Sequence, residues 1–272
     1  MSSLLQRHSS KGGVNLESIL FTLFALSVGL ATAIVIAETQ NIEYVFVYGM
    51  SNPSCGSVIN ESARLTANLH CNDHGIIVNS SNISIALNGY SIVGPGSQST
   101  KSGIIVPEHN NVTVYGPGRI ADFQSGIFAA GSSALNVSSI FLDKNRIGVY
   151  LTGFAVSSIE HNMVRNNDLG IAAHSGSGIL SNENYFRNNS LAGISLINTR
   201  DSSIVLNYIN GSQNGIFTDP SSISNSISFN YLHNIIDINS ANGLPNDLRN
   251  SSYTGNFCDL SLPSGICRGV SD

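Results

Sequence analysis

Five ionisable side chains that recur every 22 residues are the best candidates for chemistry in this sequence. One series contains Asp143, Arg165 and Arg187, and a second contains His161 and Glu183. Arginines at such a spacing can hold carboxylates through bidentate hydrogen bonds, so the set could bind an acidic sugar. The alternative is a solvated surface whose ion pairs contribute about 0–1 kcal/mol each, and we favour this alternative from the sequence.

The sequence does not predict a metal site. His70, Cys71 and His74 lie close together, but Cys71 is better used in a disulfide. The chain has three methionines and no histidine cluster, which argues against copper. The dense Gly/Asp repeat of calcium-binding solenoids is missing. We therefore expect neither a metal nor another cofactor.

A repeat of about 22 residues must position these side chains. Each unit begins with glycine followed by isoleucine or valine, at Gly103, Gly126, Gly148, Gly170, Gly193 and Gly215. An asparagine recurs later in the unit, at Asn162, Asn184, Asn207 and Asn230. A fixed period of this length is typical of a solenoid, in which each unit contacts only its neighbours.

Within the units, apolar residues alternate with other residues, as in Ile83, Ile85 and Leu87. This is the period of a β-strand, so we expect coils of short parallel strands stacked about 4.8 Å apart. We expect the repeated glycine to occupy a position with positive φ. The recurring asparagines should form a hydrogen-bonded ladder at one turn of the coils.

Composition restricts the compartment and the partners. Charged residues are 11% of the chain and the net charge is −5, without a basic stripe, which argues against nucleic acid. The repeats are flanked by four cysteines, Cys55, Cys71, Cys258 and Cys267. Of the three possible pairings, we favour the local one, which places one disulfide at each end of the solenoid. Disulfides indicate an oxidising compartment outside the cytoplasm.

The chain before the repeats divides into three expected segments. Residues 1–17 are polar, residues 18–37 are uncharged and mostly apolar, and residues 38–54 form a spacer before the repeat domain at 55–272. An apolar run of about 20 residues can span a membrane, which favours a retained anchor with the repeats outside the cytoplasm. Cleavage after Ala37, as in a secretory signal, is the alternative.

The coil length, the Gly-Ile start and the asparagine turn resemble right-handed parallel β-helix proteins of the pectin-lyase-like superfamily. The segment Cys55-Gly56-Ser57-Val58-Ile59 is similar to the first coil of secreted members, and Asn256-Phe257-Cys258 is similar to their C-terminal cap. The resemblance covers roughly residues 55–267 and implies an all-β solenoid of about 7–8 coils. Members include pectate lyases, polygalacturonases, alginate lyases, tailspikes, adhesins and a periplasmic accessory family associated with copper enzymes. The Asn-Thr-Asp, Asp-Asp and Gly-His-Gly motifs of polygalacturonases are absent.

A second resemblance concerns the N-terminus. Lys11-Gly12-Gly13 followed by Glu17 resembles a prepilin leader, in which cleavage after Gly12 makes Glu17 the fifth mature residue. We expect a cell-surface or secreted β-helix protein that acts as a non-catalytic recognition or structural module, with a polysaccharide or cell-surface glycan as its partner. The first alternative is a polysaccharide lyase or epimerase acting on acidic (uronate) glycans. The second is a pilin-like component of a surface filament.

Overall fold

The computed structural model describes residues 50–240 and 250–267, and in these ranges every regular element is a β-strand. The strands pair in parallel with the strands of the next coil, as in Phe141–Met163 and Ile127–Val149. The described ranges hold no helix of the length and apolarity that a membrane crossing requires. The expected leader at 1–17 and anchor helix at 18–37 lie outside these residues.

The strands form one 18-stranded sheet with two runs, and one eight-stranded sheet, here called sheet B. The first run contains β1 (Ser57–Ile59), β4 (Ile76–Val78), β7 (Ser102–Pro107), β10 (Ser125–Ala130), β13 (Ile147–Thr152), β16 (Leu169–Asn182), β18 (Ala192–Arg200), β21 (Asn214–Thr218), β24 (Ile236–Ser240) and β26 (Ser261–Leu262). The second run contains β2 (Ala63–Arg64), β5 (Ile83–Ala86), β8 (Val112–Tyr115), β11 (Leu135–Ser138), β14 (Ala155–Glu160), the end of β16, β19 (Ser203–Val205), β22 (Ser226–Ser228) and β25 (Ser252–Thr254). Sheet B contains β3 (Leu69–His70), β6 (Ser91–Val93), β9 (Arg119–Ala121), β12 (Phe141–Asp143), β15 (Met163–Arg165), β17 (Tyr185–Arg187), β20 (Tyr208–Asn210) and β23 (Tyr231–His233).

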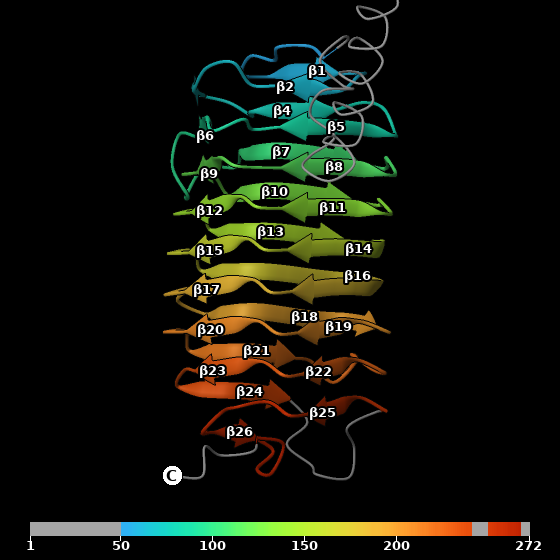
Figure 1. Cartoon of the computed structure of the whole chain (residues 1–272), viewed down its shortest axis with the longest axis vertical. Helices are drawn as coiled ribbons and strands as arrows, with labels where there is room; N and C mark the ends of the chain where they lie inside the picture. The colour runs from blue at the N-terminus through green and yellow to red at the C-terminus, as the bar shows by residue number, and fades with distance from the viewer. Residues whose placement is uncertain (1–49, 241–249, 268–272) are drawn as a thin grey trace, which may run out of the picture. The chain divides into compact units, whose positions relative to one another are not determined.

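These strands make a parallel β-solenoid of about nine coils, stacked from β1 and β2 at one end to β26 at the other (Figure 1). The expectation of about 7–8 coils was too low. The segments that flank the regular repeats also pair as strands, because Ser57 is in register with Ile76 and Ser226 with Ser252. The end segments therefore add coils to the solenoid.

The core is filled by side chains that repeat from coil to coil. In the first run Ile127 is in register with Val149, and Ile171 with Ile194, and all four side chains are fully buried. On the side of sheet B the core is lined by the residues two positions after each recurring asparagine: Val164, Phe186, Ile209 and Leu232. Each such burial contributes about 1.5–3 kcal/mol to folding.

The repeated glycines are required by close packing, and the expectation that they need positive φ was wrong. None of the six has a positive φ angle. A Cβ atom at Gly170 would lie 2.3 Å from the carbonyl oxygen of Gly193 and 2.8 Å from Cδ1 of Phe186. Positive φ occurs instead at the residue that precedes each recurring asparagine, namely at His161, Glu183, Leu206 and Phe229.

The first asparagine ladder runs along the turn between the second run and sheet B. It contains Asn162, Asn184, Asn207 and Asn230, and it continues to Asn256. The side-chain amide of Asn184 donates to the carbonyl oxygen of Ile159 at 2.7 Å and to Oδ1 of Asn207 at 3.0 Å. Its Oδ1 accepts the backbone N–H of Asn162 at 2.9 Å. The ladder thereby pairs buried backbone groups that the turn leaves unsatisfied.

A second ladder, which was not predicted, runs along the turn that follows sheet B. Asn145 donates its backbone N–H to Oδ1 of Asn167, and Asn167 donates its side-chain amide to Oδ1 of Asn189 at 2.9 Å. Asn234 continues this ladder beyond Ser212. The sequence signal was present, because an asparagine follows Asn162 and Asn184 by five residues in each case.

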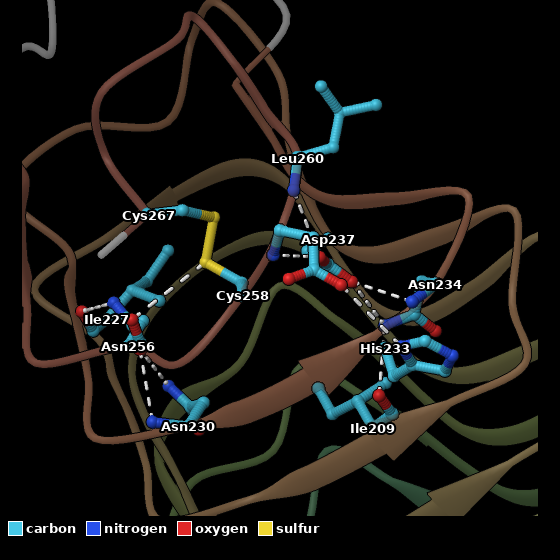
Figure 2. The surroundings of a disulfide bond; sticks show 11 residues. Ile209, Ile227, Asn230, His233, Asn234, Asp237, Asn256, Cys258, Leu260 and Cys267 are labelled. Carbon is cyan, nitrogen blue, oxygen red and sulfur yellow. Dashed lines mark hydrogen bonds and ion pairs between the residues drawn. A yellow bond between two sulfur atoms is a disulfide. The ribbon is translucent and has the colours of Figure 1, made fainter. Parts of the chain in front are cut away.

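Both ends of the solenoid carry the local disulfides, Cys55–Cys71 and Cys258–Cys267. Figure 2 shows the second of these beside Asp237, which stands where earlier coils have the glycine. Asp237 is 1% exposed. Its Oδ1 accepts the backbone N–H of Asn234 at 2.6 Å, and its Oδ2 accepts the N–H of Asp259 at 2.7 Å. The carboxylate thus closes the second ladder at the C-terminal end.

Candidate ligand-binding face

The outer face of sheet B carries the first predicted series of charged residues. Asp143 is in register with Arg165, and Arg165 with Arg187. Because side chains alternate along a strand and the preceding residues point into the core, this series lies on the outer side of the coils. The same column continues through Asn210 and His233.

Asp143 differs from the expectation of a free outward carboxylate, since it is only 4% exposed. Its Oδ2 accepts a hydrogen bond from Arg119 at 2.9 Å. Its Oδ1 lies 3.4 Å from Nε of Arg165 and accepts a 2.9 Å hydrogen bond from the amide of Asn166. Asp143 therefore orients two guanidinium groups from the coils before and after it.

The second predicted series, His161 and Glu183, lies on a different part of the coil. Both residues occupy the left-handed position just before the first ladder, and their side chains are 3.1 Å apart. The two side chains are about half exposed, at 55% and 50%. The five predicted residues thus form two groups. Asp143 contacts Arg165, His161 contacts Glu183, and Arg187 has no carboxylate within ion-pair distance among the described residues.

Further cations at sheet B and in the turn that follows it were not predicted. Arg119 begins β9, and Lys144 and Arg146 are exposed in the turn after β12. Together with Arg165 and Arg187 they make five of the eight Lys and Arg residues that the structure describes. This face is therefore basic in a chain whose net charge is −5.

A column of aromatic residues lies beside the charged column, two residues earlier in each strand. Tyr185, Tyr208 and Tyr231 are in register. Their ring centroids are 4.8 and 5.2 Å apart, with planes within 6° of parallel. Each ring covers one face of the next, and Tyr185 and Tyr231 remain 36% and 49% exposed. The signal in the sequence is the recurrence of these tyrosines every 23 residues.

The first run carries one further notable side chain. The Tyr150 hydroxyl lies 3.4 Å from Nδ1 of His174, and the buried Nε2 of His174 has no hydrogen-bond partner among the described residues. Burial lowers the pKa of His174 below its ordinary value of 6.5, against the opposing field of Asp219. Burial acts to raise the pKa of Asp219, but hydrogen bonds from Ser222 and Asn198 outweigh it and lower that pKa.

The fold and this repeating outer face define a right-handed parallel β-helix protein. A family model described as periplasmic copper-binding protein (NosD) matches residues 51–257. The chain therefore belongs to the NosD family. No curated protein matches its sequence at a significant level.

Two solved structures are similar to parts of this chain. Full-length tailspike protein 2 from an Escherichia coli O157:H7 bacteriophage is 13% identical, with a TM-score of 0.48, over 67% of this chain and 32% of that one. An alginate lyase from Paenibacillus sp. str. FPU-7 is 11% identical, with a TM-score of 0.47, over 76% of this chain and 81% of that one. The chain thus spans about a third of the tailspike.

The side chains of the described residues do not fit the copper that the family description names. Residues 50–240 and 250–267 contain no group of three or more His, Cys, Asp or Glu side chains arranged to hold a metal ion. All four cysteines are in disulfides, so none supplies a thiolate. Copper sites use imidazole, thiolate or thioether ligands that converge on one point. We derive no chemistry through copper.

Proposed function

We propose that this protein is a non-catalytic recognition module that binds carbohydrate outside the cytoplasm through the outer face of sheet B. The observation that carries the proposal is the pair of adjacent columns, Arg165 and Arg187 beside the stacked Tyr185, Tyr208 and Tyr231. Guanidinium and phenol groups supply hydrogen bonds to sugar hydroxyls and carboxylates. The two disulfides fit an oxidising compartment. We also propose that residues 18–37 anchor the protein in a membrane.

The alternative function is that of a lyase or epimerase, which would need a general base beside the arginines of sheet B, Arg119, Arg165 and Arg187. The carboxylates of Asp122 and Asp143 are the acidic groups nearest to Arg119, at 3.8 and 2.9 Å. Asp143 is also buried and engaged by Arg165. Carboxylates committed to ion pairs in this way favour binding over proton abstraction.

The test is a glycan-binding screen of the full chain, combined with detection of unsaturated products from uronate polymers. We expect binding to at least one polysaccharide without product formation. Product formation would show that the alternative is right, and binding to no glycan would refute the proposal.

Two variants locate the binding surface. Arg165→Ala combined with Arg187→Ala should weaken binding while the circular dichroism spectrum is unchanged. Arg200→Ala is the matched control, because Arg200 is exposed, belongs to β18 in the other sheet, and lies 3.9 Å from its nearest carboxylate, Asp201. Equal loss of binding in the control and the double variant would exclude sheet B as the site.

A further inference from the structure

The last coils of the solenoid expose an apolar patch beside the first asparagine ladder. Its four side chains are each about half exposed: Leu206 52%, Phe229 56%, Tyr231 49% and Phe257 54%. Leu206 and Phe229 directly precede asparagines of the ladder, whereas Tyr231 and Phe257 directly follow them and are in register. Because the ladder itself is buried, the two columns lie side by side at the surface. Contiguous exposed apolar side chains of this kind are typical of an interaction site.

The backbone at Leu206 and Phe229 also indicates a function for these side chains. Their φ angles are 56° and 55°, in the left-handed region that asparagine and glycine adopt readily and that large apolar residues rarely adopt. The equivalent residues of earlier coils are polar, namely His161 and Glu183. A large apolar residue at such a position costs backbone energy, and these two are too exposed to recover it in the core. A contact outside the chain accounts for their presence.

The apolar patch lies between opposite charges. Arg187, one coil before Leu206, has no carboxylate within ion-pair distance among the described residues. Arg187 is followed in its column by Asn210 and His233. Asp259 lies in the next coil, where its carboxylate is 70% exposed and 3.7 Å from His233. This column is therefore positive at one end of the patch and negative at the other.

We propose that the apolar patch is a dimer interface, at which two copies of this chain pack face to face with their solenoid axes antiparallel. The two-fold axis runs parallel to the strands, between β20 and β23, which are neighbours near the C-terminal end of sheet B (Figure 1). It reverses the order of the coils and places each column opposite the same column of the other copy. Leu206 then faces Phe229 of the partner subunit, and Tyr208 faces Tyr231 of the partner subunit.

The charged column supports a second copy as the occupant and selects the antiparallel arrangement. Arg187 faces Asp259 of the partner subunit, and symmetry forms this pair twice. Asn210 faces His233 of the partner subunit, so polar groups also meet polar groups. With the solenoid axes parallel, this column would instead face the apolar column of the partner subunit and bury polar groups without hydrogen bonds. The surface is thus complementary to itself in both charge and polarity.

The interface covers Arg187 and the tyrosine column, which the proposed function assigns to carbohydrate. A bound polysaccharide and a second copy therefore exclude each other. This exclusion rests on the proposed function, whereas the dimer itself does not.

The first test is sedimentation velocity of the full chain over a concentration series without glycan, in which we expect a monomer–dimer equilibrium. Leu206→Asn combined with Phe229→Asn should raise the dimer dissociation constant about tenfold or more, because the apolar centre of the interface is lost. Asparagine suits the left-handed backbone, so the circular dichroism spectrum should not change. Val156→Asn is the matched control, since Val156 is 69% exposed at a positive φ of 38° but belongs to β14, outside sheet B. It should leave the dissociation constant unchanged.

The second test exchanges the charges. Arg187→Asp alone and Asp259→Arg alone each place like charges at both copies of the contact, and each should raise the dissociation constant about tenfold or more. A chain that carries both substitutions should dimerise as the wild type does, because opposite charges face each other again. Within one chain these residues are three coils apart, about 14 Å, so the recovery cannot arise inside a single copy.

Several outcomes would overturn this inference. A monomer at every concentration would refute the dimer, and a dimer that the two asparagine substitutions leave unchanged would show that the contact lies elsewhere. Charge substitutions that fail to correct each other would refute the antiparallel arrangement. A polysaccharide that is bound in the screen and leaves the dimer intact would refute the mutual exclusion. The two proposals fail separately, because a dimer with these responses in a chain that binds no glycan supports the interface and refutes the proposed function alone.

Discussion

Replacing Asp237 by alanine should destabilise the C-terminal end of the solenoid. Its carboxylate accepts four hydrogen bonds in the cap of Figure 2: from the backbone and side-chain amides of Asn234, at 2.6 and 3.2 Å, and from the backbone N–H groups of Asp259 and Leu260, at 2.7 and 3.2 Å. Alanine would leave three backbone donors without this partner. A buried unsatisfied donor costs about 1–3 kcal/mol. Two of these three donors belong to the exposed residues Asp259 and Leu260, where water can replace part of the lost hydrogen bonding. We therefore expect a loss of free energy of unfolding in the lower part of the summed range, about 3–5 kcal/mol.

The assay is urea denaturation of the full chain followed by far-ultraviolet circular dichroism. Asp259→Ala is the matched control, because this carboxylate lies at the same end of the solenoid but is 70% exposed. Its one ion pair among the described residues is a long contact of 3.7 Å with His233. We expect the control to change the free energy of unfolding by less than about 1 kcal/mol. If Asp237→Ala also changes it by less than about 1 kcal/mol, the closing role of this carboxylate is refuted.

Three further predictions follow from packing, cross-linking and titration. Gly170→Ala should destabilise the fold by about 1–3 kcal/mol in the same urea assay, because its Cβ would lie 2.3 Å from the Gly193 carbonyl oxygen, and an unchanged midpoint would contradict the packing argument. Cys258→Ser with Cys267→Ser should lower stability by about 2–3 kcal/mol, as expected for a loop closed across 9 residues. The wild type under reducing conditions should lose at least as much, because Cys55–Cys71 is then broken as well, and an unchanged midpoint in the variant would contradict this prediction. The lowered pKa of His174 means that the unfolded chain binds its proton more readily, so stability from this group is present above pH 6.5 and is lost as the pH falls. Urea midpoints between pH 7.5 and pH 5.5 should therefore fall less in His174→Gln than in the wild type, and equal slopes would contradict this prediction.

The strands and the stacking of the scaffold could be predicted, because each sequence repeat of about 22 residues forms one coil of the solenoid. The prediction of strands rested on alternation in Ile83, Ile85 and Leu87, and β5 contains the first two of these residues. The reason for the regular spacing of the glycines was not predictable. Positive φ is a property of a single residue, whereas the contact of Gly170 with Gly193 and Phe186 exists only after coils have stacked.

The candidate site was predicted less completely than the scaffold. The spacing of Asp143, Arg165 and Arg187 correctly placed them in one column. It did not reveal that Arg119, one coil earlier, covers Asp143 and reduces its exposure to 4%. Nor did it reveal that Lys144 and Arg146 are exposed beside this column, because they lie in a turn rather than at a repeated strand position.

The sequence by itself determined the solenoid, its period and the inward residues. In a coiled chain the spatial neighbours of a residue lie one period away, so spacing along the sequence translates directly into contact. Only the tertiary structure decided which charges pair, which rings stack and where each turn absorbs an extra residue. Those outcomes depend on the register between coils, which varies from 22 residues for Asn162–Asn184 to 26 for Asn230–Asn256. Asp143, Arg165 and Arg187 are therefore one part of a longer face of cations and tyrosines that the packed coils bring into line, whereas His161 and Glu183 pair on another part of the coil.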